Sequence, residues 1–146
     1  MAVDLQYAGE YHLKELLVHT SSGNVLKLTK AVQSIDIYED MFSTSLSGSV
    51  TILDVDNIAE NGPVIGQEYM TLRIATPTLE EQEISIMFSI YKVGVREAVS
   101  QDTQLLSLSF TSPELLKDKQ VRVSKSYTDS IHNIIENILR DTRDIG

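Results

Sequence analysis

The chain has 146 residues, typical of one ordinary domain, which buries roughly 70% of its unfolded surface without disulfide or metal staples. It contains no cysteine, which excludes a disulfide framework and a thiolate metal site. The formal net charge of −9 argues against tight nucleic-acid binding, because such proteins neutralise phosphates with a basic face, whereas a like-charged wall would let DNA slide past.

No apolar run approaches the ~20 residues of a membrane-spanning helix. The first residues, Met1-Ala2-Val3-Asp4, lack the basic-then-apolar order of a signal peptide. We therefore expect no stable membrane association. Residues 1–10 show no clear period and are expected to form a loosely held arm.

Alternation of apolar and polar residues predicts β-strands along the first half of the chain. Successive side chains of a strand point to opposite faces, so alternation places one apolar row on a core. The predicted strands are Tyr11–Val18, Val25–Leu28, Ala31–Glu39, Ser45–Asp54 and Glu68–Ala75. Gly48 occupies an apolar position within the fourth, where a missing side chain indicates close packing or a bend.

Residues 54–63 read as one short inserted helix. Asp54 or Asp56 can cap its start, and Gly62 followed by Pro63 can end it. The Asp54-x-Asp56 spacing resembles the start of a calcium loop, but the following positions lack the oxygen ligands and the turn glycine of that loop. Helix capping is the better interpretation of the two aspartates.

The most regular pattern in the sequence lies between Glu83 and Thr111. Apolar residues alternate from Ile84 to Ile90 and again within Gln104–Thr111, which predicts two paired strands. The pattern slips at Tyr91-Lys92. Because a one-residue slip would flip the buried set to the other face, we expect a β-bulge or a sharp bend there.

The C-terminal part is predicted to contain one helical turn at Pro113–Lys117, a last short strand at Lys119–Lys125 and one substantial helix at Thr128–Arg143. Ser126 and Asp129 have capping-box spacing. Six or seven strands before one amphipathic helix predict a mainly antiparallel β-barrel or sandwich. The expected domains are residues 1–125 and a C-terminal helix, 126–146, that could start a following domain.

The search for chemistry finds no catalytic constellation. The three histidines, His12, His19 and His132, lie on separate predicted elements, so surface histidines explain them better than a metal site. Ser47-Gly48-Ser49 lacks the glycine that a nucleophile elbow needs two places before its serine. We expect no enzyme activity, no cofactor and no bound metal.

Two surfaces remain as candidates for contact with other molecules. The Ser- and Thr-rich faces of 45–51 and 107–111 are polar but weakly charged, which suits contact with another subunit as well as with water. Four basic residues lie close together near the C-terminus, and they form either a solvated turn or a docking patch for an acidic neighbour: Lys117, Lys119, Arg122 and Lys125.

Several segments follow one another in a specific order: Ile35–Asp40, Gly48–Asp54, Gly66-Gln67-Glu68 opening Tyr69–Ala75, the central strand pair, Ser112–Leu116 and Ser126–Ile131. This order, from Ser34 to Leu139, resembles the central baseplate hub protein of T4-like contractile-tail phages. The resemblance implies a tail-tube-like antiparallel β-barrel, related to hub domains of type VI secretion spikes. It implies a structural virion protein of the tail baseplate, assembled in the host cytoplasm, and no catalytic residues.

Such hubs form a ring that joins the tail tube protein to the central membrane-piercing spike protein, and DNA passes through the bore without specific binding. The acidic residues that could line the bore are Asp36, Glu39, Glu80, Glu81 and Glu83. Family hubs carry two barrels per chain, so that three chains complete the ring. This chain has one predicted barrel, so it is a fragment or N-terminal part of a hub that assembles as a trimer, or six copies form a hexamer.

Two other function classes fit the sequence less well. A stand-alone β-domain that binds carbohydrate or protein, as on a phage fibre or adhesin, would cluster exposed aromatics on one face. The tyrosines that could do this are scattered along the sequence: Tyr7, Tyr11, Tyr38, Tyr69 and Tyr91. A small hydrolase would need a nucleophile and a base, which the sequence does not supply.

Overall fold

The computed structural model describes residues 10–54, 64–76, 83–100, 103–120 and 124–140. These residues belong to two compact units that divide between Ser112 and Pro113. The domain boundary expected between residues 125 and 126 stays a prediction. The strands of the first unit are β1 (His12–His19), β2 (Val25–Lys27), β3 (Val32–Tyr38), β4 (Ser47–Asp54), β5 (Tyr69–Ala75), β6 (Ile84–Ala98) and β7 (Gln104–Thr111).

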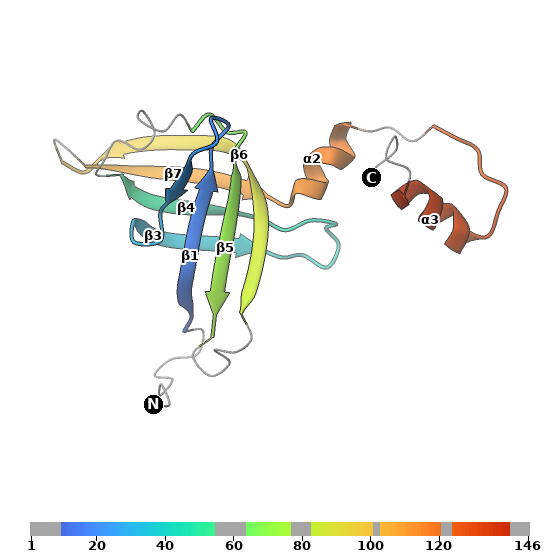
Figure 1. Cartoon of the computed structure of the whole chain (residues 1–146), viewed down its shortest axis with the longest axis horizontal. Helices are drawn as coiled ribbons and strands as arrows, with labels where there is room; N and C mark the ends of the chain where they lie inside the picture. Colours follow the sequence, from blue (N-terminus) through green and yellow to red (C-terminus); the bar gives the residue numbers. More distant parts are fainter. Residues whose placement is uncertain (1–9, 55–63, 77–82, 101–102, 121–123, 141–146) are drawn as a thin grey trace. The chain divides into compact units, whose positions relative to one another are not determined.

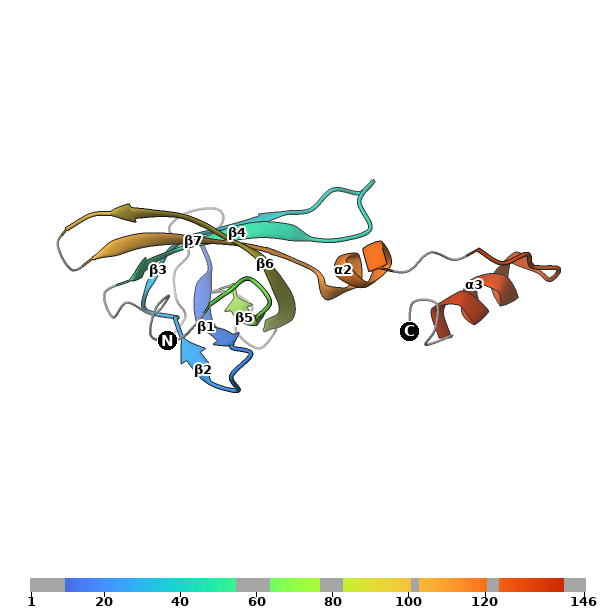
Figure 2. The ribbon, with the colours of Figure 1, turned by 90° about the horizontal axis from the view of Figure 1, so that it is seen from above.

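All these strands form one antiparallel sheet in the order β2-β1-β5-β6-β7-β4-β3. Strand β6 joins its two halves: residues 84–89 pair with β5, and residues 89–98 pair with β7. Figures 1 and 2 show β6 curving from the half that holds β1 and β5 to the half that holds β7 and β4. The sheet is therefore a half-barrel, and its edge strands β2 and β3 are not paired with each other.

The bend in β6 is the bulge that the sequence predicts. The register of the β6–β7 pair shifts between Ile90 and Lys92, and again between Val93 and Arg96. A bulge increases the local twist and bends the strand. The expectation at Tyr91-Lys92 is confirmed, and this bulge allows one long strand to serve both halves of the sheet.

The core lies on the inner side of the curved sheet, where the alternating apolar rows meet. Phe88 of β6 and Phe110 of β7 are fully buried at its centre, with ring centroids 4.6 Å apart and ring planes tilted by 45°. Buried residues from three further strands, β1, β4 and β5, surround them: Leu16, Val18, Val50, Ile52, Met70 and Leu72. The predicted mainly antiparallel β fold is confirmed, with the barrel open rather than closed.

The second unit differs from the sequence expectations in detail. Helix α2 (Pro113–Gln120) continues past the single predicted turn. The strand expected at Lys119–Lys125 is therefore wrong at its start, because Lys119 belongs to α2. Its middle, residues 121–123, lies outside the described residues. A run of good helix formers after Pro113 explains the longer helix.

Helix α3 (Ile131–Arg140) begins later than Thr128 because its cap lies later. The Ser130 hydroxyl accepts a hydrogen bond from the Asn133 backbone N–H at 3.4 Å, which is the N-cap contact. Asp129 supports this turn by accepting hydrogen bonds from the Ser130 N–H and the Asn133 side chain. The capping box expected from Ser126 to Asp129 is thus replaced by a cap at Ser130. The C-terminal amphipathic helix itself is confirmed.

Three sequence expectations lie outside the described residues. They are the arm at 1–9, the inserted helix at 55–63 and most of the acidic loop at 77–82. Asp54, expected as a helix cap, is the buried last residue of β4. Among the residues that the structure describes, no helix has the length and apolar character needed to cross a bilayer.

Candidate interaction surface

The outer side of the β4–β7 pair carries a cluster of hydroxyl groups, which we call the hydroxyl face. It consists of Ser47, Ser49 and Thr51 of β4 with Ser107, Ser109 and Thr111 of β7. The two strands pair so that each β4 hydroxyl residue stands directly opposite a β7 hydroxyl residue. Their inner neighbours are in the core, so alternation turns these residues to the opposite side of the sheet. Five of them are half-buried, whereas Thr111 is 2% exposed and donates its hydroxyl to the Leu46 carbonyl at 3.0 Å. The two polar rows of the sequence thus become one surface.

The hydroxyl face is nearly neutral and bordered by one charge of each sign. Asp36 of β3 pairs with Ser49, Ser49 pairs with Ser109, and Ser109 pairs with Lys92 of β6. The four residues form one row across four strands, with exposed side chains at both ends. Such a surface can form hydrogen bonds with a neighbouring protein without gripping phosphate groups.

The acidic residues expected at the bore are only partly brought together. Asp36 and Glu39 are exposed on and just after β3. Glu83 lies before β6 in the other half of the sheet, where its carboxylate accepts a 2.9 Å hydrogen bond from Arg73. This bond, and a second one to Glu15, raise the pKa of the Arg73 guanidinium above its ordinary value. Glu80 and Glu81 lie outside the described residues, and the lining of a bore stays a prediction.

The basic patch is described for three of its four residues. Lys117 and Lys119 are exposed in the last turn of α2, where positive charge is favourable to the helix dipole. Lys125 is exposed in the segment that follows, and Arg122 lies outside the described residues. Docking by this patch stays a prediction.

The described histidines are not gathered into one site. His19 Nε2 lies 3.1 Å from the Thr71 hydroxyl, and His132 Nε2 lies 4.0 Å from a carboxylate oxygen of Glu136. In the described ranges, no three His, Asp or Glu side chains are grouped to hold a metal ion.

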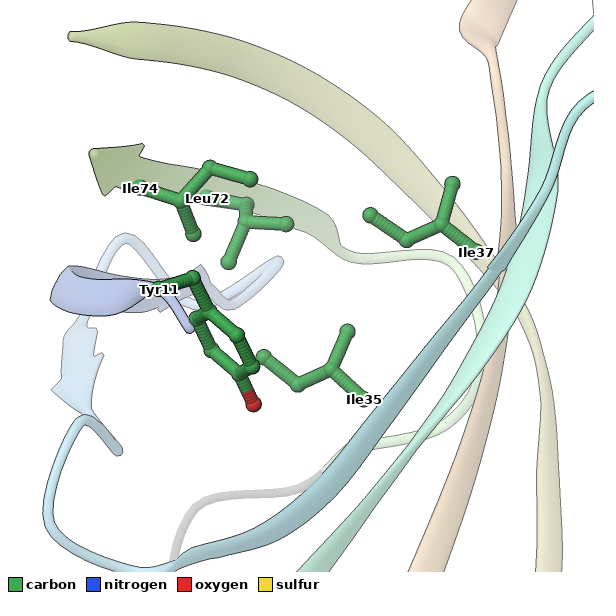
Figure 3. A pocket seen from close by; sticks show the side chains of 5 residues that line it. All are labelled: Tyr11, Ile35, Ile37, Leu72 and Ile74. Carbon is green, nitrogen blue, oxygen red and sulfur yellow. The ribbon is translucent and has the colours of Figure 1, made fainter. Parts of the chain in front are cut away.

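An apolar pocket opens on the inner side of the half-barrel. Tyr11, Leu72 and Ile74 line it from the side of β1 and β5, and Ile35 and Ile37 line it from β3 (Figure 3). Its volume is about 240 Å³. The sequence does not predict this pocket, because alternation predicts that each strand has an inner face but not which inner faces stay uncovered.

A buried carboxylate, which the alternation pattern does not predict, shapes the turn before β5. The Glu68 side chain is 1% exposed and accepts hydrogen bonds from the backbone N–H groups of Ile65, Gly66 and Gln67 at 2.7, 2.8 and 3.0 Å. Gly66 has a φ of +92°, a conformation that glycine adopts without strain. The Glu68 carbonyl also accepts the Ile90 N–H at 2.8 Å, which ties this turn to the bend of β6.

Replacing Glu68 by glutamine should lower the free energy of unfolding by about 2–3 kcal/mol, because the amide nitrogen cannot accept the N–H groups that the carboxylate binds. Urea denaturation of the purified protein measures this change. The matched control is Glu97→Gln, since Glu97 is exposed on β6. Equal stability of the two variants would show that the turn does not depend on the charge of Glu68.

Comparison with known proteins gives a match in fold only. No family model matches the sequence, and no curated protein matches it. The fold is similar to that of a chain in PdpA–VgrG complexes. The half-lidded Francisella complex matches with a TM-score of 0.51 and 10% identity over 88% of this chain.

Two further PdpA–VgrG structures agree with that match. The lidless complex has a TM-score of 0.51 and 11% identity over 84% of this chain, and the lidded Francisella complex has a TM-score of 0.51 and 12% identity over 84%. This chain spans only 22%, 23% and 19% of the three matched chains. The sequence identity is low, so the likeness establishes the fold and leaves function to be argued separately.

Proposed function

We propose that this chain is a structural subunit of the hub that joins a tube to a central spike in a contractile injection machine, specifically the baseplate of a contractile-tail phage. It acts by shape and contact rather than by catalysis. Its partners are further copies of itself, a tail tube protein and a central spike protein. It resides in the virion tail and is assembled in the host cytoplasm.

The observation that carries this proposal is the open half-barrel. Its two edge strands leave backbone N–H and C=O groups available for pairing, and native proteins cover such edges. An open curved sheet therefore fits a subunit that neighbours complete. The same fold is found in a chain of the PdpA–VgrG complexes, and the element order resembles a baseplate hub.

The hydroxyl face supports a role as part of a wall along which DNA passes. A wall that lets DNA slide must not bind phosphates, and this face presents hydroxyl groups on a chain with a net charge of −9. A stand-alone binding domain is less well supported, because the exposed tyrosines come from separate parts of the sheet: Tyr11 before β1, Tyr38 on β3, Tyr69 on β5 and Tyr91 on β6.

Electron microscopy of the purified protein tests the proposal. The protein is mixed with a tail tube protein and a central spike protein of a contractile-tail phage. We expect rings with a central hole, trimeric or hexameric, that bind both partners. A protein that stays monomeric in every mixture and binds neither partner would contradict the hub assignment. A matched sample without partners shows whether ring formation depends on them.

A further inference from the structure

The loop between β3 and β4 ends in two exposed apolar side chains, and we call residues 39–45 the hairpin tip. Met41 and Phe42 are each 88% exposed, more than any other large apolar side chain of the described residues. Burying a phenylalanine or methionine side chain is favourable by about 1.5–3 kcal/mol, so solvent exposure of both forgoes that stabilisation. An adjacent exposed pair of this kind marks a contact site.

The hairpin tip is ordered by its own hydrogen bonds. The Phe42 N–H donates to the Asp40 carboxylate at 3.0 Å, and the Ser43 N–H donates to the Asp40 carbonyl at 2.9 Å. The Ser43 hydroxyl donates to the Ser45 carbonyl at 3.0 Å. A preorganised tip loses little conformational entropy when it binds, so Met41 and Phe42 are suited to act as a rigid knob.

The pocket of the half-barrel has the size and chemistry to receive such a knob. Its lining is apolar, apart from the hydroxyl group of Tyr11, and its volume is about 240 Å³. A cavity of about 150 Å³ lined by apolar side chains holds a benzene molecule. The pocket can therefore hold the ring of Phe42. Tyr11 and Ile37 at its lining are themselves 50% and 37% exposed and would gain burial.

We propose that the hairpin tip of one copy inserts Phe42 into the pocket of a second copy of this chain. The tip follows Ile37 of the pocket lining on the same hairpin but extends away from the sheet, so we place it in the pocket of another copy. Figure 2 shows the β3–β4 loop projecting beyond the sheet. Each copy carries one knob and one pocket, so the contact is head-to-tail and repeats from copy to copy.

This inference deepens the proposed function, because it names the contact between copies of the hub protein. It rests on that proposed function only where the contacts are taken to close into a ring. Sedimentation equilibrium measures self-association of the purified chain. Phe42→Ser should weaken it by about 10- to 100-fold. Met87→Ser is the matched control and should change it less than 2-fold, because Met87 is 55% exposed on β6, away from the pocket.

Salt gives a second readout of the same contact. Two copies with a net charge of −9 each repel one another, and salt screens that repulsion. An apolar knob in an apolar pocket should therefore bind more tightly as salt is raised from 50 to 500 mM sodium chloride. Association that weakens with salt, or a wild-type chain that stays monomeric throughout, would overturn the inference.

Disulfide trapping locates the contact, because the natural chain has no cysteine. Phe42→Cys mixed with Ile37→Cys should form a disulfide between copies under mild oxidation, whereas Phe42→Cys mixed with Met87→Cys should not. Equal disulfide yields in the two mixtures would overturn the inference. It would also be overturned if a single chain that carries both Phe42→Cys and Ile37→Cys formed the disulfide within itself.

The two proposals fail in different ways. Rings that bind tube and spike but are unaffected by Phe42→Ser would overturn the knob contact and leave the hub assignment standing. Copies that are trapped between Phe42→Cys and Ile37→Cys but never bind tube or spike would leave the knob contact standing and overturn the hub.

Discussion

Replacing Phe88 by alanine should lower the free energy of unfolding by about 3–5 kcal/mol, the usual cost of removing a fully buried aromatic ring. The ring lies 4.6 Å from that of Phe110, so its loss removes an aromatic contact as well as buried area. It also leaves a cavity in the first arm of β6, close to the bend that joins the two halves of the sheet. Urea denaturation followed by far-UV circular dichroism measures the effect.

The neighbouring Met87→Ala is the matched control for Phe88→Ala. Met87 is on the same strand with an exposed side chain, so its truncation should cost no more than about 0.5 kcal/mol. If Phe88→Ala unfolds the protein outright, Phe88→Leu provides the test instead. It should lower the free energy of unfolding by less, because a leucine refills part of the space. A Phe88→Ala variant as stable as Met87→Ala would contradict the described core.

Replacing Gly48 by alanine should destabilise the protein by about 3 kcal/mol or more, at the upper end for an overpacked core. A Cβ atom at this position would overlap the Asp36 carbonyl oxygen of β3 and lie 2.6 and 2.8 Å from two ring carbons of Phe110. The Asp36 oxygen belongs to a paired strand, so it cannot move aside without breaking the β3–β4 ladder.

Ser49→Ala on the adjacent outer position is the control for Gly48→Ala and should cost no more than about 0.5 kcal/mol. A double-mutant cycle separates the two overlaps. Phe110→Leu should relieve the ring contact. The double variant Gly48→Ala/Phe110→Leu should therefore lose less stability than the sum of the losses of the two single variants. Full additivity would mean that the Phe110 ring does not limit the side chain at position 48. Thermal denaturation of all four proteins provides the comparison.

The close packing predicted at Gly48 and the bulge predicted at Tyr91-Lys92 are both confirmed, and for a physical reason. At Gly48 the alternation demands an apolar side chain, so glycine there signals a space already filled, which the structure shows to be filled by Phe110. At Tyr91-Lys92 the alternation changes phase. Only a β-bulge, which inserts one extra residue, can keep the apolar side chains of both arms of β6 facing one core. Both signals are local, so they can be read without knowing which strands pair.

The strand expected at Lys119–Lys125 was wrong at its start because short alternation is a weak signal. The good helix formers after Pro113 continue α2 as far as Gln120, which includes Lys119. The start of α3 was misplaced for a similar reason, since Ser126, Asp129 and Ser130 can all cap a helix and only the hydrogen bond to Asn133 selects Ser130.

The sequence by itself determined the strands, the bend in β6, the close packing at Gly48 and the inner and outer face of each strand, because these depend on a period of two residues within one segment. Only the tertiary structure decided that the barrel stays open, that β4 and β7 align their hydroxyl groups in one face, and that a pocket remains between β3 and β5. These features depend on which strands meet and in what register, and pairing of distant segments leaves no periodic trace in either segment alone.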